Sequence, residues 1–157
     1  MELLESLKEI ADSFILQYGY IALFILSFTE SIIQPVPPYP FITAAPIFNL
    51  SPWMAANVAF VGNLLGAVVS FKLAQILGDK FVKKLFRKKL YLKGQALMNR
   101  YGFFAVIIGE PYKLMCWLAG AFKMSFWKFM IASIIARFIR IYLFALLGES
   151  IGRIFFS

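Results

Sequence analysis

Two long apolar runs dominate the hydrophobic pattern of this 157-residue chain. As α-helices, residues 53–78 would extend over about 39 Å and residues 125–148 over about 36 Å. Each length is sufficient to cross a hydrocarbon core of about 30 Å with some tilt. Both runs are therefore predicted to be transmembrane helices, and the expected fold class is an all-α integral membrane protein.

A proline cluster divides a third apolar segment, residues 20–48. The stretches on its two sides would extend over only about 13 Å and about 12 Å as helices, which is too short to cross the membrane. Proline removes a backbone hydrogen-bond donor and clashes with the preceding turn, so the two stretches cannot form one straight helix. We therefore predict a re-entrant hairpin, whose arms enter and leave the membrane on the same side. The helix-breaking residues are Pro35, Pro37, Pro38 and Pro40.

Residues 103–122 have the same form. A short apolar run ends at the sequence GEPYK, residues 109–113, in which Gly109 and Pro111 break the helix, and a second short run follows. This segment is predicted to be a second re-entrant hairpin.

An internal repeat relates the two halves of the chain. A shift of 74 residues places APIFNLSPW (residues 45–53) over AGAFKMSFW (residues 119–127), with identical residues at four of nine positions, and places Pro37 over Pro111. Each repeat unit would be a re-entrant hairpin followed by a transmembrane helix. Because such a unit crosses the membrane an odd number of times, the two units are predicted to be inverted relative to each other.

The segment between the two units is strongly basic. Residues 79–100 carry eight of the 16 Lys and Arg residues and one acid, Asp79. By the positive-inside rule this segment is predicted to be a cytoplasmic loop. The net charge of +8 is then attributed to orientation and to contact with anionic lipid headgroups rather than to nucleic-acid binding. Residues 1–17 are acidic and amphipathic, unlike a cleaved signal peptide, and are predicted to remain as a helix on the outer surface.

The composition argues against several kinds of site. Hydrophobic residues make up 61% of the chain, as expected for a membrane protein, while histidine is absent and Cys116 is the only cysteine. Zinc sites, Cys/His catalysis and internal disulfides are therefore not expected, and neither is a metal or another cofactor. No serine–lysine or aspartate pair is arranged as in an intramembrane protease or phosphatase, so we do not expect an enzyme.

Ionisable residues stand in or beside the predicted membrane segments. Arg137 and Arg140 are three residues apart, hence on one face of the second transmembrane helix, and they lie near its middle. A charge at that depth costs about 2.5–3.5 kcal/mol on insertion scales, so it needs a partner or a substrate. Lys113 and the two arginines are predicted to bind an anionic substrate, with a structural ion pair as the alternative for the arginines. Glu30 and Glu110 are predicted to be counter-ions or protonatable coupling groups.

A small-residue motif lies in the first transmembrane helix. Gly62 and Gly66 form a GxxxG pattern, which lets helices approach closely. The 74-residue shift places Gly66 over Arg140. We therefore predict that the two transmembrane helices cross at the glycines, and that the arginines fill the space beside them.

Three stretches of the chain resemble the DedA family of membrane proteins, which share the VTT (SNARE-associated) domain, and in particular its YqaA-like branch. Residues 18–40, YGYIALFILSFTESIIQPVPPYP, are similar to the family's first hairpin, in which an acid precedes prolines. Residues 62–78, GNLLGAVVSFKLAQILG, are similar to its glycine-spaced helix. Residues 110–140, EPYKLMCWLAGAFKMSFWKFMIASIIARFIR, look like the P-Y-K, A-G and arginine-pair pattern of the branch. The resemblance covers residues 18–152.

The resemblance implies two inverted re-entrant hairpins packed against spanning helices. It also implies a role in moving lipids between leaflets: undecaprenyl phosphate or phospholipids in bacterial members, and scrambling in eukaryotic relatives. By position, Glu30 matches the acid of the family's first hairpin, Pro37 and Pro111 match the hairpin prolines, and Lys113 matches a hairpin cation.

The leading interpretation is a flippase-like or scramblase-like transporter in the plasma (inner) membrane of a prokaryote. Its partners would be membrane lipids, either an anionic phospholipid or a polyprenyl phosphate, because cations outnumber acids by three to two in the predicted site. The alternatives are a proton- or cation-coupled transporter of a small solute and a structural or assembly protein. Whether copies of the chain associate as a homo-oligomer stays open.

Overall fold

The computed structural model describes residues 18–33, 36–109 and 112–156, and every regular element in these ranges is a helix. The all-α fold class is therefore confirmed for the described part of the chain. Residues 1–17, predicted to be an amphipathic surface helix, lie outside the described residues.

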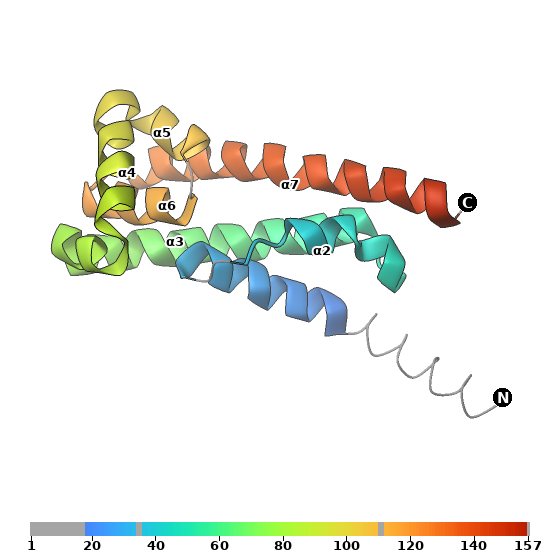
Figure 1. Ribbon diagram of the computed structural model, residues 1–157. Helices are drawn as coiled ribbons and strands as arrows, with labels where there is room; N and C mark the ends of the chain where they lie inside the picture. The colour runs from blue at the N-terminus through green and yellow to red at the C-terminus, as the bar shows by residue number, and fades with distance from the viewer. Residues whose placement is uncertain (1–17, 34–35, 110–111, 157) are drawn as a thin grey trace.

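Two long helices form the spine of the molecule (Figure 1). Helix α3 (Pro52–Leu85) and helix α7 (Phe126–Phe156) lie side by side and run in opposite directions. Both are long and apolar enough to cross a membrane. Proline suits the first position of α3, and the Ser51 side chain caps this end by accepting a hydrogen bond from the Met54 amide.

The outer surface of α7 suits contact with lipid. Side chains that cover several turns of the helix are between 38% and 60% exposed although they are large and apolar. An apolar surface of this extent is unusual for a soluble monomer and is expected where acyl chains replace water. The exposed residues are Ile131, Ile135, Phe138, Ile139, Leu143 and Leu146.

The first broken segment, residues 18–48, consists of the helix Tyr18–Ile32, a break, helix α2 (Tyr39–Thr43) and the 3-10 helix η1 (Ala45–Phe48). The first arm, which is the helix Tyr18–Ile32, continues past the apolar stretch that ends at Phe28. Between Phe28 and Ile32 there is no glycine or proline, so nothing stops the helix, and the polar side chains of this turn find partners on α3.

The second broken segment, residues 103–121, consists of α5 (Phe103–Ile108) and α6 (Tyr112–Ala121). It follows the basic segment 79–100, which was predicted to be a loop but is helical for most of its length. Helix α3 kinks at Gly78, where φ is +76°, and continues to Leu85, and helix α4 (Lys88–Tyr101) follows. Leu, Lys, Gln, Ala and Met are good helix formers, so a basic connection of this composition need not be irregular.

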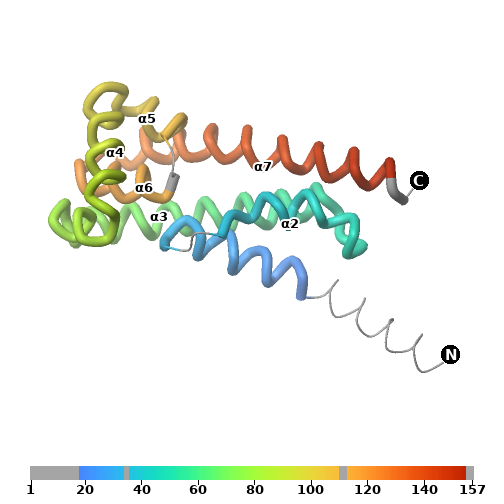
Figure 2. Tube along the Cα trace, viewed as in Figure 1, coloured from blue at the N-terminus to red at the C-terminus, as the bar shows by residue number. Residues whose placement is uncertain are grey.

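The two arms of each broken segment pack on different spanning helices, and Figure 2 shows α5 beside the first part of α7. The first arms pack on the spanning helix of their own half, Tyr18–Ile32 on α3 and α5 on α7. The second arms exchange partners, so that α6 packs on α3 while α2 and η1 pack on α7. Gly120 permits the first of these close contacts, since an added Cβ would lie 2.2 Å from the Phe71 carbonyl oxygen.

The same turn precedes both spanning helices. Asn49 has φ +55° and Lys123 has φ +53°, and these are the non-glycine residues with positive φ in the described chain. Each turn is closed by the hydrogen-bond pair of a Schellman motif. In the first turn the Asn49 amide donates to the Pro46 carbonyl and the Leu50 amide to the Ala45 carbonyl, and residues 74 positions later repeat both bonds.

Candidate functional site

Arg137 on α7 is the largest fully buried side chain in the described chain, and only 1% of it is exposed. Its Nη2 donates to the Ser31 hydroxyl at 3.2 Å and lies 3.9 Å from Glu30 Oε2. Its Nη1 donates to the Tyr39 hydroxyl at 3.4 Å. A guanidinium this deep needs a counter-charge and several acceptors, and the first broken segment supplies these three.

Glu30 is held in place by α3. Asn63 Nδ2 donates to Glu30 Oε2 at 2.7 Å. The adjacent Ser31 hydroxyl donates to the Asn63 backbone carbonyl at 2.9 Å, and the Ser70 hydroxyl donates to the Ser31 carbonyl at 2.8 Å. Glu30, Ser31, Asn63 and Arg137 thus form one network, which we call the polar centre. It joins the end of the first arm to both spanning helices.

The polar centre lies about a third of the way along each of the two long helices, counted from the first residue of each helix. Asn63 is 11 residues after the first residue of α3, and Arg137 is 11 residues after the first residue of α7, so each is about 17 Å from the start of its helix. Because the two helices run in opposite directions, these positions are reached from opposite ends of the molecule. The polar centre is therefore expected near the bilayer midplane.

The second broken segment supplies donors to the end of the first arm. Lys113 Nζ donates to the Ile33 carbonyl at 3.2 Å, and Trp117 Nε1 donates to the Ile32 carbonyl at 3.0 Å. The last carbonyls of a helix lack partners within the helix, and a cation there also interacts favourably with the helix dipole. Lys113 and Trp117 therefore connect the two broken segments where they meet.

Arg140 does not contact Glu30. Its Nη2 instead lies 3.5 Å from the carbonyl of Ile107, at the end of α5. Ile107 and Ile33 are 74 residues apart, so a cation interacts with the carbonyl at the equivalent position of each broken segment. The two arginines of α7 thus have different environments: one is buried in the polar centre, and the other is half-buried beside the second broken segment.

The predicted helix breaks are partly described. Pro38 is buried and is the N-cap of α2, whereas Pro37 and Pro40 are exposed. Gly109 ends α5, and a Cβ there would lie 2.5 Å from the Ala105 carbonyl oxygen, so only glycine fits without movement. The remaining predicted site residues, Glu110, Pro35 and Pro111, lie outside the described residues.

Gly62 and Gly66 lie at a close helix contact, but their neighbour is not the one predicted. An added Cβ would lie 2.7 Å from the Phe24 carbonyl oxygen at Gly62 and 2.2 Å from the Phe28 carbonyl oxygen at Gly66. The first arm therefore fills the space beside the glycines, and the prediction that the arginines fill it is wrong. Arg137 reaches the first arm instead, because Glu30 and Ser31 offer it acceptors.

Sequence reasoning missed several polar residues that complete the site. Asn63 stands alone among apolar residues of α3, a pattern that signals a buried hydrogen-bonding role. Ser31 adjoins Glu30, and Tyr39 lies within the proline cluster between Pro38 and Pro40, but neither a serine nor a tyrosine by itself indicates a buried polar site. In the described part of the chain, no group of three or more His, Cys, Asp or Glu residues could hold a metal ion.

Comparison with known proteins identifies the family. The profile of the VTT domain matches residues 36–150, which include Lys113, Arg137 and Arg140. The chain belongs to the VTT-domain (DedA) family. It is accordingly a membrane protein, in agreement with its two membrane-length apolar helices.

Two relatives match nearly the whole chain. A protein of Methanocaldococcus jannaschii, described as uncharacterized, is 35% identical over 141 residues, which cover 87% of this chain and 88% of the relative. The uncharacterized membrane protein YbfM of Bacillus subtilis is 25% identical over 157 residues, which cover 92% of this chain and 97% of YbfM. No solved structure matches the chain.

Proposed function

We propose that this protein is a lipid transporter of the flippase or scramblase type, which moves an anionic phospholipid or a polyprenyl phosphate between leaflets. The burial of Arg137 within an apolar helix of membrane-spanning length, with its guanidinium on Ser31 and Tyr39 of the first broken segment, carries the proposal. A buried arginine in a membrane is costly, and intramembrane cations typically mark a substrate pathway or a counter-ion. Transport rather than catalysis is proposed because, among the described residues, the side chains around Arg137 are not arranged as a nucleophile and base.

In this proposal the two broken segments are re-entrant hairpins related by an inverted repeat. The repeated turn at Asn49 and Lys123 supports a common origin of the two halves. Their opposite direction is supported by the antiparallel spanning helices, and by the position of α5 and α6 at the end opposite the start of the first arm (Figure 1). Broken backbone at membrane depth is tolerated where protein or water surrounds it, so the hairpin ends would line the pathway.

The interactions of Arg137 suggest how a phosphate could be bound. Its separation from Glu30 is 3.9 Å, longer than the 2.7–2.9 Å of a close charge-assisted hydrogen bond. A lipid phosphate that reaches the polar centre could therefore replace Glu30 as the partner of the guanidinium, with Lys113 and Arg140 on the adjoining carbonyls as further cations. Glu30 would remain bonded to Asn63 and release the arginine to the substrate.

A proton- or cation-coupled transporter is the second candidate, and one observation favours it. The Oδ1 atom of Asn63 is buried and has no hydrogen-bond partner in the described chain, although Nδ2 of the same side chain donates to Glu30. An amide oxygen beside a carboxylate could accept a hydrogen bond from a proton donor, or it could coordinate a small cation. The ion pair with Arg137 argues for the counter-ion role of Glu30 instead.

For orientation we propose that α4 faces the cytoplasm in a prokaryotic plasma membrane. This helix and its flanks carry most of the basic cluster between residues 79 and 100. The first broken segment would then enter from outside and the second from the cytoplasm. A cysteine placed at Arg87, which is exposed, should react with an impermeant reagent only after cells are opened, and labelling of intact cells would reverse this orientation.

The transport proposal is tested in proteoliposomes with headgroup-labelled lipids, including phosphatidylglycerol and a polyprenyl phosphate. The informative variant is Arg140→Gln, because Arg140 is half-buried and its guanidinium lies beside the Ile107 carbonyl of the second broken segment. We expect it to slow translocation about tenfold or more, a loss that corresponds to about 1.4 kcal/mol. Arg153→Gln is the matched control, since Arg153 lies on the same helix but is exposed near its end.

Two results would count against the lipid transporter. Wild-type protein that moves none of these lipids faster than empty vesicles would exclude it. Equal translocation rates for the wild type and Arg140→Gln would show that Arg140 does not take part in binding the lipid. Translocation that requires a pH gradient, and that is lost in a Glu30→Gln variant whose thermal unfolding shows it to be folded at the assay temperature, would instead support proton coupling.

A further inference from the structure

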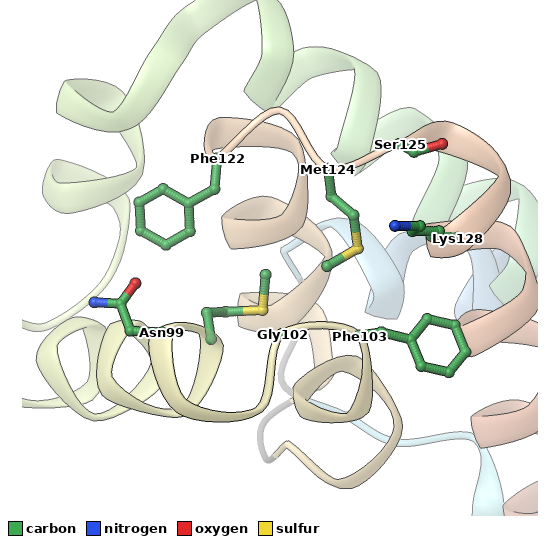
Figure 3. Close-up of a pocket in the computed structure, with 8 residues that line it drawn as sticks. Asn99, Gly102, Phe103, Phe122, Met124, Ser125 and Lys128 are labelled. Atoms are coloured by element: carbon green, nitrogen blue, oxygen red, sulfur yellow. The ribbon is translucent and has the colours of Figure 1, made fainter.

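A cavity of about 350 Å³ lies at the end of the molecule where α4, α5, α6 and α7 meet (Figure 3). Its apolar wall comes from Met98, Phe103, Phe122 and Met124. Its polar side chains are Asn99 on α4, Ser125 directly before α7, and Lys128 in the first turn of α7. The cavity is separate from the polar centre and shares no residue with it.

Two turns whose central residues have positive φ border the cavity. Gly102, with φ +51°, joins α4 to α5, and Lys123, with φ +53°, joins α6 to α7. Nothing lies within 4 Å of the place where a Cβ on Gly102 would be, so the cavity is open beside this residue.

The cavity lies at the depth of the lipid headgroups. Helix α7 has 31 residues and extends over about 46 Å, which matches a whole bilayer including its polar layers rather than the hydrocarbon core alone. Ser125 and Lys128 are at its beginning, hence at one interface. This end also carries α4, whose first turn is basic, and anionic lipid headgroups favour such a surface.

The chemistry of the lining is amphipathic, as a phospholipid is. Among the described residues Lys128 forms no ion pair, and its side chain is exposed. The apolar wall begins directly beside it, at Met124. A volume of about 350 Å³ is within the range of ligand sites and exceeds the needs of a phosphate group alone.

We infer that this cavity binds the headgroup region of an anionic phospholipid from the leaflet that contacts α4, with Lys128 on the phosphate. The upper parts of the acyl chains would pack on Met98, Phe103 and Met124, and the remainder would lie in the membrane. The inference rests on the proposed function in one respect, because the site would hold a lipid before it enters the transport pathway.

A cavity in the other half, which shares two lining positions with this one under the 74-residue shift, provides a comparison. A cavity of about 440 Å³ is lined by Phe48 and Leu50, which are 74 residues before Phe122 and Met124. Its lining residues are apolar, and Met54 stands where the repeat has Lys128. It therefore suits an acyl chain but offers no cation to a phosphate. The two ends of the molecule should differ in lipid preference.

The test measures lipid binding to the full chain in detergent by native mass spectrometry. The probes are phosphatidylglycerol and phosphatidylcholine with identical acyl chains, and inorganic phosphate alone. We expect the wild type to prefer phosphatidylglycerol about fivefold, and Lys128→Gln to abolish this preference. Lys89→Gln is the matched control, because Lys89 is an exposed cation on α4 that does not line the cavity.

A second variant tests the cavity itself. Asn99 is exposed and lines the cavity from α4, so Asn99→Trp should fill the space without disturbing the core. We expect it to lower the binding of both lipids while the thermal unfolding curve stays unchanged.

Each other outcome would overturn the inference. These outcomes are equal binding of the two lipids by the wild type, an unchanged preference in Lys128→Gln, full lipid binding by Asn99→Trp, and occupancy by inorganic phosphate equal to that by lipid. Binding is measured without translocation, so it can fail while transport is intact. Conversely, a protein that binds phosphatidylglycerol through Lys128 but moves no lipid would refute only the transport proposal.

Discussion

Asn49 and Lys123 have the same left-handed backbone conformation and are separated by 74 residues, the shift that aligns the two halves of the sequence. Asparagine tolerates this conformation because its short polar side chain can bond locally, whereas lysine gains nothing from it. The repeat has therefore kept the geometry of the turn with different residues. The second turn is held by the packing of α6 and α7 on their neighbours rather than by the preference of its central residue.

Lys123→Gly should stabilise the protein, because glycine adopts positive φ without a steric penalty. We expect a gain of about 1 kcal/mol in the free energy of unfolding in detergent micelles. Asn49→Gly should gain less, because asparagine already suits the conformation. A loss of stability on Lys123→Gly would mean that the lysine side chain makes a contribution larger than the strain of its backbone.

Gly66→Ala should weaken the packing of the first arm on α3. The added Cβ would lie 2.2 Å from the Phe28 carbonyl oxygen, so the first arm must move away, at a cost of about 1–3 kcal/mol. Gly152→Ala is the control within a long helix, since its nearest neighbour would be a Pro46 side-chain atom at 3.2 Å. Thermal unfolding compares the two, and equal melting temperatures would contradict the close contact at Gly66.

Glu30 and Arg137 should behave as a coupled pair. Removal of either charge takes from the other the ion-pair partner that lies 3.9 Å away, so Glu30→Gln and Arg137→Gln should each destabilise the protein by about 3–5 kcal/mol. The double variant should lose clearly less than the sum of the two single losses. A double-mutant cycle of unfolding free energies measures this difference, and strict additivity would show that the two side chains do not interact.

Trp117→Phe should loosen the contact between the two broken segments. The substitution removes the indole donor to the Ile32 carbonyl, and loss of a buried hydrogen bond costs about 1–3 kcal/mol. Trp127→Phe is the matched control, because Trp127 is 74% exposed and its change should lie within about 0.5 kcal/mol. Hydrogen exchange of the Ile33 amide, near the end of the first arm, should rise in the first variant only.

Features set by local sequence could be predicted well. The apolar length of α3 and α7 and the glycine at the end of α5 are visible in the residues themselves, since helix length and helix breaks depend on neighbours along the chain. The membrane class and the family agree with these predictions. Glu30 and Arg137 could be named as buried charges, because an ionisable residue in an apolar run demands a partner.

Features set by tertiary contacts could not be predicted. The sequence does not show that Thr29 to Ile32 continue the first arm, because their helix is stabilised by bonds to α3. Nor does the sequence distinguish Arg137 from Arg140. The two arginines lie on the same face of one helix, so the sequence does not show which of them would meet a given partner. Their separation into a buried and a half-buried arginine depends on which broken segment each one meets.

The exchange of second arms has a consequence for biogenesis. The amino-terminal half leaves the ribosome first, with the α3 surface that will contact α6 still uncovered and with α2 lacking its support on α7. Neither half can therefore reach its final structure before the other has been synthesised. Two separately expressed fragments divided near Arg87 should each be degraded when alone and should accumulate when produced together.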